Sequence, residues 1–181
     1  DPHKLINKLL SPEALSIKLN LNADLMSICR PYMERMYNIV KGSGAYILLS
    51  DREGYILDVI GDPDIVYQGE SYSLLVAGAC RSEVLAGTNA VGTTLYLNHP
   101  IQFWGEEHYI EWHKAYTCAG APFYDVNDNL LGSITVTCKI SYAHPHTLGM
   151  VSCAADSITR EVKLKAAMAK LELLNSQRNM M

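Results

Sequence analysis

Two predicted β-hairpins constrain the fold of this chain more than any other feature. The run AYILLSDREGYILDVIGD predicts strands at about 45–50 and 55–60, joined by the polar turn DREG. Later, TCAGAPFYD and LLGSITVTC predict strands at about 117–124 and 130–138, joined by VNDN, a turn of the kind that Asn and Asp favour. The strands of a hairpin run antiparallel, so we expect an antiparallel sheet.

Helical patterns flank the two hairpins. Ser11 is followed by a proline and an acidic residue, which is typical of a helix start. Residues 22–40 then place apolar side chains three and four positions apart, with Pro31 expected to interrupt or restart the helix. A long helix is predicted from Thr147 to about Ser176. The expected fold class is therefore α+β, with an antiparallel sheet and flanking N- and C-terminal helices.

Composition excludes several classes of function. The 181 residues include 15 basic and 19 acidic side chains, and the net charge of −4 argues against nucleic-acid binding by this segment. No apolar run approaches the roughly 18 residues of a membrane span, so no membrane contact is predicted. The five cysteines form no CxxC pair and are odd in number, which disfavours disulfides and structural zinc. A reducing cytoplasm fits this pattern best.

The last predicted strand has two chemically different faces. Apolar side chains alternate along it with hydroxyl side chains, so one face is expected to meet helices. The hydroxylated face either lines a pocket or faces solvent, where threonine is favoured by its β-propensity. The apolar positions are Ile134, Val136 and Cys138, and the hydroxylated positions are Ser133, Thr135 and Thr137.

Aromatic and histidine side chains concentrate in residues 100–118, which contain both tryptophans, Trp104 and Trp112. If residues 106–114 form a helix, His108 and Trp112 lie one turn apart and can stand over a small ligand. The alternative is a packed helix whose histidine is satisfied internally.

The same segment gives little support for catalysis. His99, His108, His113 and Cys118 could be imagined as metal ligands, but they lack a tight ligand spacing. A catalytic pair of Cys118 with His108 lacks an identifiable orienting acid and oxyanion donor. The GTNAVG run lacks the GK[ST] ending of a phosphate loop. We therefore predict no enzyme activity, no metal and no cofactor.

The C-terminal helix carries two apolar stripes, which is more than one domain needs to dock a helix. A helix-mediated homodimer is the favoured interpretation, and packing of the second stripe on the N-terminal helices is the alternative. One stripe consists of Ala155, Ile158, Val162, Ala166, Ala169 and Leu173, and the other of Leu164, Met168, Leu171 and Leu174.

Several ordered motifs together resemble one family. They are SGAYILLSDREGYILDVIGD (43–62), GTNAVGTTL (87–95), PIQFWGEEHY (100–109), TCAGAPFYDVNDNLLGSITVT (117–137) and HPHTLGMVSCAADSI (144–158). Over about residues 22–165, the chain resembles the N-terminal GAF sensor domain of sigma-54-dependent transcriptional activators of the acetoin-catabolism and dihydroxyacetone-operon regulator type. In that family a AAA+ ATPase and a helix-turn-helix DNA-binding domain follow the sensor.

The resemblance implies a domain order and a function. Residues 1–21 would be a helical lead-in, 22–165 the GAF sensor, and 166–181 a signalling helix toward an output domain. The sensor would bind a small metabolite on one face of its sheet and transmit the signal through dimer helices. Together with the strand and aromatic patterns, this gives a candidate ligand-binding set of Trp104, His108, Trp112, Cys118, Thr135 and Thr137.

Two alternatives follow from the same resemblance. The domain could receive its signal by docking a partner protein, as in the dihydroxyacetone regulators, or act as a thiol reductase like a few GAF domains. The chain also departs from the family at 133–137, where it has SITVT and lacks the acidic residue of the common Leu-Asp-Leu-Thr pattern. A specific effector such as acetoin therefore does not carry over.

Overall fold

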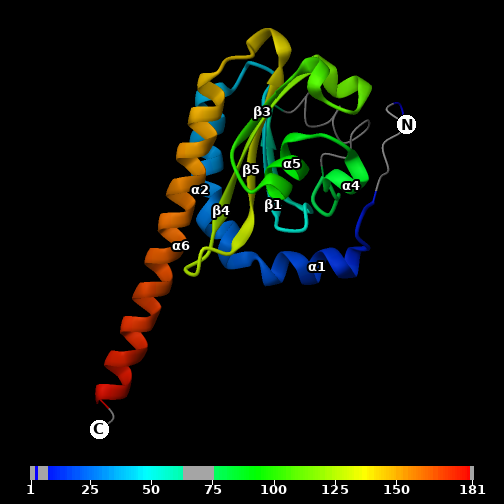
Figure 1. Cartoon of the computed structure of the whole chain (residues 1–181). Coiled ribbons are helices and arrows are strands. Elements are labelled where there is room, and N and C mark those ends of the chain that lie inside the picture. The colour runs from blue at the N-terminus through cyan, green and yellow to red at the C-terminus, as the bar shows by residue number, and fades with distance from the viewer. Residues whose placement is uncertain (1–2, 4–7, 63–75, 180–181) are drawn as a thin grey trace.

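The computed structural model describes residues 3, 8–62 and 76–179, and its centre is a five-stranded antiparallel sheet (Figure 1). The strand order is β2-β1-β5-β4-β3, so the two predicted hairpins lie next to each other through the β1–β5 pair. The strands are β1 (Tyr46–Asp51), β2 (Ile56–Gly61), β3 (Ile101–Trp104), β4 (Tyr116–Tyr124) and β5 (Leu130–Lys139). Both hairpins and the α+β class are confirmed.

Helices cover both faces of this sheet (Figure 1). α2 packs on β1 and β2, and α6 packs on β4 and β5, while α5 lies against β3, β4 and β5. The helices are α1 (Pro12–Leu21), α2 (Ala23–Val40), α4 (Glu83–Ala86), α5 (Ala90–Leu97) and α6 (His146–Asn179), with short 3-10 helices η1 (Gly105–Glu107), η2 (Glu111–Ala115) and η3 (Ile140–Tyr142). No helix among these described residues is long and apolar enough to cross a membrane.

Side chains alternate between the two faces of the sheet, and each face covers its own buried region. Ile134 and Val136 of β5 are fully buried in the core that the sheet forms with α2 and α6. Thr135 and Thr137 point to the opposite face, where α5 lies. The prediction that the apolar face of this strand meets helices is confirmed, and the hydroxylated face is buried rather than exposed to solvent.

Pro31 does not interrupt the second helix, so that expectation was wrong. α2 runs without a break from Ala23 to Val40. A proline removes one backbone donor, which costs most where the freed carbonyl is buried. Here Pro31 and Ser27, four residues earlier, are both exposed, so water can satisfy the Ser27 carbonyl. Cys29 and Met33 on the other side of α2 keep the helix anchored in the core.

The last helix extends well past the sheet (Figure 1). Its first half buries Val151, Ala155 and Ile158 against the sheet and α2. Residues 164–179 are all exposed, including the leucines of the predicted second stripe. The second stripe thus does not pack on the N-terminal helices of its own chain.

Candidate ligand cavity

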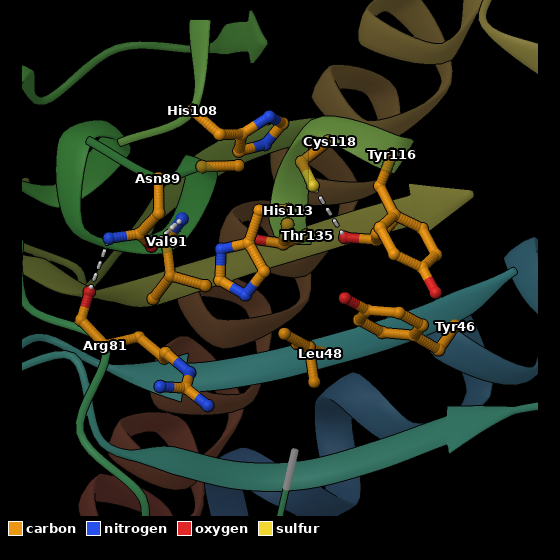
Figure 2. Close-up of a pocket in the computed structure, with 12 residues that line it drawn as sticks. Tyr46, Leu48, Arg81, Asn89, Val91, His108, His113, Tyr116, Cys118 and Thr135 are labelled. Atoms are coloured by element: carbon orange, nitrogen blue, oxygen red, sulfur yellow. Dashed lines mark hydrogen bonds between the residues drawn. The ribbon is translucent and has the colours of Figure 1, made fainter. Parts of the chain in front are cut away.

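A small cavity lies between the sheet and α5, on the face opposite to α2 and α6 (Figure 2). Its volume is about 30 Å³, and roughly 10–15 Å³ of such space suffices for one water molecule. Figure 2 shows Arg81 and Asn89 at one side and Tyr46 and Tyr116 at the other. The lining residues are Tyr46, Leu48, Arg81, Asn89, Ala90, Val91, His108, His113, Tyr116, Cys118, Thr135 and Thr137.

The GTNAVG run builds one wall of this cavity. The Asn89 side-chain oxygen caps α5 by accepting from the backbone N–H groups of Val91 (3.1 Å) and Gly92 (3.0 Å). Its Nδ2 donates to the backbone carbonyls of Gly87 (2.8 Å) and Arg81 (3.1 Å), the latter drawn in Figure 2. The buried Asn89 amide therefore joins the start of α5 to the segment that carries Arg81.

Replacing Asn89 tests this role. We expect Asn89→Ala to lower the free energy of unfolding by about 2 kcal/mol, the upper end for an N-cap, because buried donors and acceptors lose their partners. Urea unfolding measures this loss. Ser11→Ala, which removes the exposed cap of α1, is the matched control and should cost about 0.5–1 kcal/mol. Equal losses in the two variants would show that Asn89 is only a helix cap.

Arg81 is the most unusual group in the cavity lining. It is 3% exposed, and its Nη2 has no hydrogen-bond partner. No carboxylate among the described residues forms an ion pair with its guanidinium, and Glu83, two residues later, also has a buried oxygen without a partner. Burial lowers the pKa of Arg81 to about 10, so it remains a cation at neutral pH. The cavity wall thus contains a buried positive charge that the described residues do not neutralise.

Two histidines also line the cavity. The Nδ1 of His108 lies 3.0 Å from the Gly105 carbonyl, whereas its buried Nε2 has no partner. His113 lies with its ring centroid 6.0 Å from that of His108. Burial, with the nearby Arg81 charge and His108 adding to it, lowers the pKa of His113 to about 3, and burial also lowers the pKa of His108. Both rings are therefore neutral at physiological pH.

Residues 106–114 do not form a single helix, so the hypothesis that places His108 and Trp112 one helical turn apart was wrong. The segment instead forms the two 3-10 turns η1 and η2, with His108 in extended backbone between them. The Gly105 carbonyl accepts from both the backbone N–H and the ring Nδ1 of His108, which ends the first turn. Ile110, which lies between the two turns, is 1% exposed, so its side chain is buried.

The predicted ligand-binding residues divide into two groups. His108, Cys118, Thr135 and Thr137 all line the cavity. The two tryptophans do not belong to its lining: Trp104 is 38% exposed, and the ring of Trp112 stacks on that of His113 with centroids 5.8 Å apart. Trp112 therefore packs on a residue that lines the cavity without lining the cavity itself.

The Cys118 thiol, which lines the cavity, lacks the features of a reactive nucleophile. Burial raises the pKa of Cys118 to about 12, and the Thr137 hydroxyl donates to its sulfur at 3.1 Å. Burial also raises the pKa of Cys138. A thiol reductase needs a thiolate as its nucleophile, and these two cysteines are thiols at neutral pH. No group of three His, Cys, Asp or Glu side chains in the described part of the chain could hold a metal ion.

Comparison with known proteins places the chain in a family. The family model described as "MimR, N-terminal domain" matches residues 17–161. The chain belongs to the MimR N-terminal domain family. This confirms the resemblance to the activator sensor domains that the sequence motifs indicated.

Two relatives in this comparison are regulators of transcription. A "Signal-transduction and transcriptional-control protein" of Clostridium beijerinckii is 36% identical over 165 residues, covering 91% of this chain and 26% of the relative. The "Acetoin dehydrogenase operon transcriptional activator AcoR" of Bacillus subtilis (strain 168) is 31% identical over 168 residues, covering 93% of this chain and 28% of AcoR. The chain thus spans about a quarter of the length of these curated relatives.

A solved structure shares the fold closely. The crystal structure of the E. coli DhaR(N)-DhaL complex superposes with a TM-score of 0.91 at 14% identity, covering 97% of this chain and 60% of that one. At this low identity the likeness establishes the architecture that the MimR N-terminal domain shares with DhaR(N), namely the antiparallel sheet with flanking helices.

Several family motifs prove to hold the fold of this MimR N-terminal domain. Asn89 caps α5, and Asp125 accepts three hydrogen bonds in the β4–β5 turn, from the backbone of Asn127 and from the backbone and side chain of Asn129. The motif residues therefore point to the fold more directly than to a ligand. Sequence reasoning missed Arg81 as a lining residue, because a single arginine outside a motif resembles any surface arginine.

Proposed function

We propose that this chain is the signal-input domain of a bacterial transcriptional activator, without enzymatic activity of its own. Membership of the MimR N-terminal domain family supports this role, as do relatives named as transcriptional regulators. We place the sensor at residues 22–165 and the signalling segment at 166–181, and we expect DNA contacts to come from another domain. A cytoplasmic location fits a regulator of transcription whose cysteines are all free.

The observation that carries a sensing role is the set of buried polar atoms around the cavity. Arg81 Nη2, His108 Nε2 and Thr135 Oγ1 are buried without a hydrogen-bond partner, and all three residues line the cavity. Buried polar groups are normally satisfied, and each one left unpaired destabilises a fold. A small metabolite that supplied these partners would bind at this place. We therefore propose that five residues contact the ligand: His108, Cys118, Thr135 and Thr137 from the sequence prediction, and Arg81 from the structure.

The fold also offers a route for the signal. β4 and β5 carry cavity residues on one face, and their other face packs on α6. Beyond the sheet, Leu164, Met168 and Leu171 form an exposed stripe at spacings of four and three. We propose that this stripe pairs with a second copy of the chain and that a ligand acts through its differential affinity for two arrangements of the helices.

Polar substitution of the stripe tests the homodimer. The double variant Leu164→Asn, Leu171→Asn should weaken dimerisation at least about tenfold, because it removes apolar area from the interface. Size-exclusion chromatography with light scattering over a concentration series measures this. Lys165→Gln with Lys170→Gln is the control, since both lysines lie on the same exposed part of α6. A wild-type domain that is monomeric at every concentration would refute the proposed pairing.

Docking of a partner protein is the second candidate for the input signal. Its support is the structural neighbour, because DhaR(N) was crystallised as a complex with DhaL. Among the compared proteins this is the more direct precedent, and the cavity of about 30 Å³ leaves room for only a small molecule. In this alternative the outer surface of the domain, rather than the cavity, would receive the signal.

A thermal-shift panel on the purified domain distinguishes the two inputs. Small diols, ketones, amines, amino acids and organic acids would be titrated at constant pH. A ligand that binds only the folded state raises the melting temperature in a saturable way, following RT ln(1 + [L]/Kd). A saturable rise for one class supports metabolite sensing. If no compound raises the melting temperature of a cooperatively folded protein, the result contradicts metabolite sensing and favours docking of a partner.

A further inference from the structure

We propose that the cavity binds a small hydroxy acid, with its carboxylate on Arg81 and its hydroxyl group donating to Nε2 of His108. This inference rests on the proposed function, since it names the chemical class of the metabolite. It combines three observations: a buried cation that no described residue pairs with, a buried acceptor without a donor, and the volume of the cavity that both residues line.

The anionic half of the ligand follows from Arg81. A buried cation is stable when a carboxylate pairs with it, and none of the described residues supplies one. Tyr46 also lines the cavity, but burial raises its pKa far above the neutral range, so it is no phenolate partner for the guanidinium. The planar fork of arginine matches a carboxylate with two parallel hydrogen bonds. A ligand carboxylate would therefore provide the missing charge.

The hydroxyl half follows from the tautomer of His108. Its Nδ1 lies 3.0 Å from a carbonyl oxygen, which can only accept, so Nδ1 carries the proton. In the neutral ring Nε2 then holds a lone pair and needs a donor. A carboxylate has no donor to offer, whereas an alcohol does. Thr135 Oγ1, also without a partner, can donate to or accept from the same ligand.

The size and the remaining walls of the cavity limit the ligand. A volume of about 30 Å³ corresponds to two or three water-sized positions. Leu48, Ala90 and Val91 form an apolar part of the lining, which suits a methyl group. Among acids with a hydroxyl next to the carboxylate, glycolate and lactate are the smallest, so they come nearest to this size.

Titration calorimetry with three matched probes tests the proposal. Lactate, tried as both enantiomers, carries both groups; propanoate lacks the hydroxyl, and 1,2-propanediol lacks the charge. We expect lactate to bind at least about tenfold more tightly than either analogue, because each analogue leaves one buried group unpaired. Propanediol binding as tightly as lactate would overturn the hydroxy-acid proposal while leaving metabolite sensing intact. If none of the three probes binds, so that water alone fills the cavity, the hydroxy-acid proposal is overturned too. The wider thermal-shift panel then decides whether metabolite sensing survives.

Variants of Arg81 separate binding from structure. Arg81→Met should weaken lactate binding at least about tenfold and raise the melting temperature of the ligand-free domain by about 2–4 °C, because it removes an unpaired buried charge. Arg52→Gln, at an exposed arginine, should change neither quantity. If Arg81→Met fails to fold, Arg81→Lys keeps the charge without the fork and should still weaken binding. Unchanged lactate affinity in the folded variant would contradict the role of Arg81.

Discussion

Acidification from pH 7 to pH 5 is expected to destabilise this domain through His113. Burial holds the pKa of His113 in the folded state near 3, whereas an unfolded histidine titrates near 6.5. Between these values the unfolded chain binds a proton that the folded chain does not. The stability that the neutral His113 ring contributes is therefore fully present above about pH 6.5. As the pH falls from there toward the folded-state pKa near 3, the free energy of unfolding decreases by up to about 1.4 kcal/mol per pH unit.

Urea unfolding at pH 7, 6 and 5 measures this effect. His113→Gln removes the titrating ring, so its stability should depend less on pH than that of the wild type. His99→Gln is the control, because His99 is exposed, and its pH dependence should match the wild type. Identical pH dependence in the wild type and His113→Gln would show that His113 is not held neutral by the fold.

Gly120→Ala is expected to destabilise the domain strongly, because there is no room for a Cβ between β4 and α5. A Cβ atom at Gly120 would lie 2.7 Å from the Ala90 carbonyl oxygen and 2.5 Å from Thr94 Oγ1. α5 approaches β4 this closely because residue 120 has no side chain. Separating them would open the cavity wall. Overpacking typically costs about 1–3 kcal/mol, and we expect the upper end here because the Ala90 carbonyl belongs to the backbone.

Gly149→Ala provides the matched control for this prediction. Gly149 lies in α6, and a Cβ there meets nothing within 4 Å. Alanine is a better helix former than glycine, so this variant should gain about 0.5–1 kcal/mol. Thermal and urea unfolding of both variants measure the contrast. A Gly120→Ala variant as stable as the wild type would show that the contact between α5 and β4 can yield at little cost.

The local patterns were sufficient to predict four of the five strands and the helices α1, α2 and α6, whereas β3 was not predicted. The hairpins fell within one residue of their expected bounds, at 46–51 with 56–61 and at 116–124 with 130–139, because alternation and turn residues act locally. The face of β5 was predictable for the same reason, since Ile134 and Val136 alternate with threonines. The helix beginning at 146 was also predictable from its apolar spacing.

The sequence could not predict which side chains surround the cavity. Arg81 and Tyr46 come from separate segments that meet only in the folded sheet, and neither carries a local pattern that signals a pocket. The helical spacing around His108 was misleading because it takes no account of Gly105. This glycine has a φ of +41°, and its carbonyl oxygen accepts two hydrogen bonds from His108, which ends the turn. Trp104 was expected at a ligand, but the register of β3 on β4 leaves it 38% exposed.

We propose that this domain receives a small-molecule signal in its cavity and controls an activator through it. The most direct test is transcription in a purified system, using the full-length activator that carries this domain, with and without the ligand found by titration. We expect a response to the ligand that needs no partner protein, persists in Arg52→Gln and is lost in Arg81→Met. A response that appears only when a partner protein is added, and that Arg81→Met leaves unchanged, would contradict it.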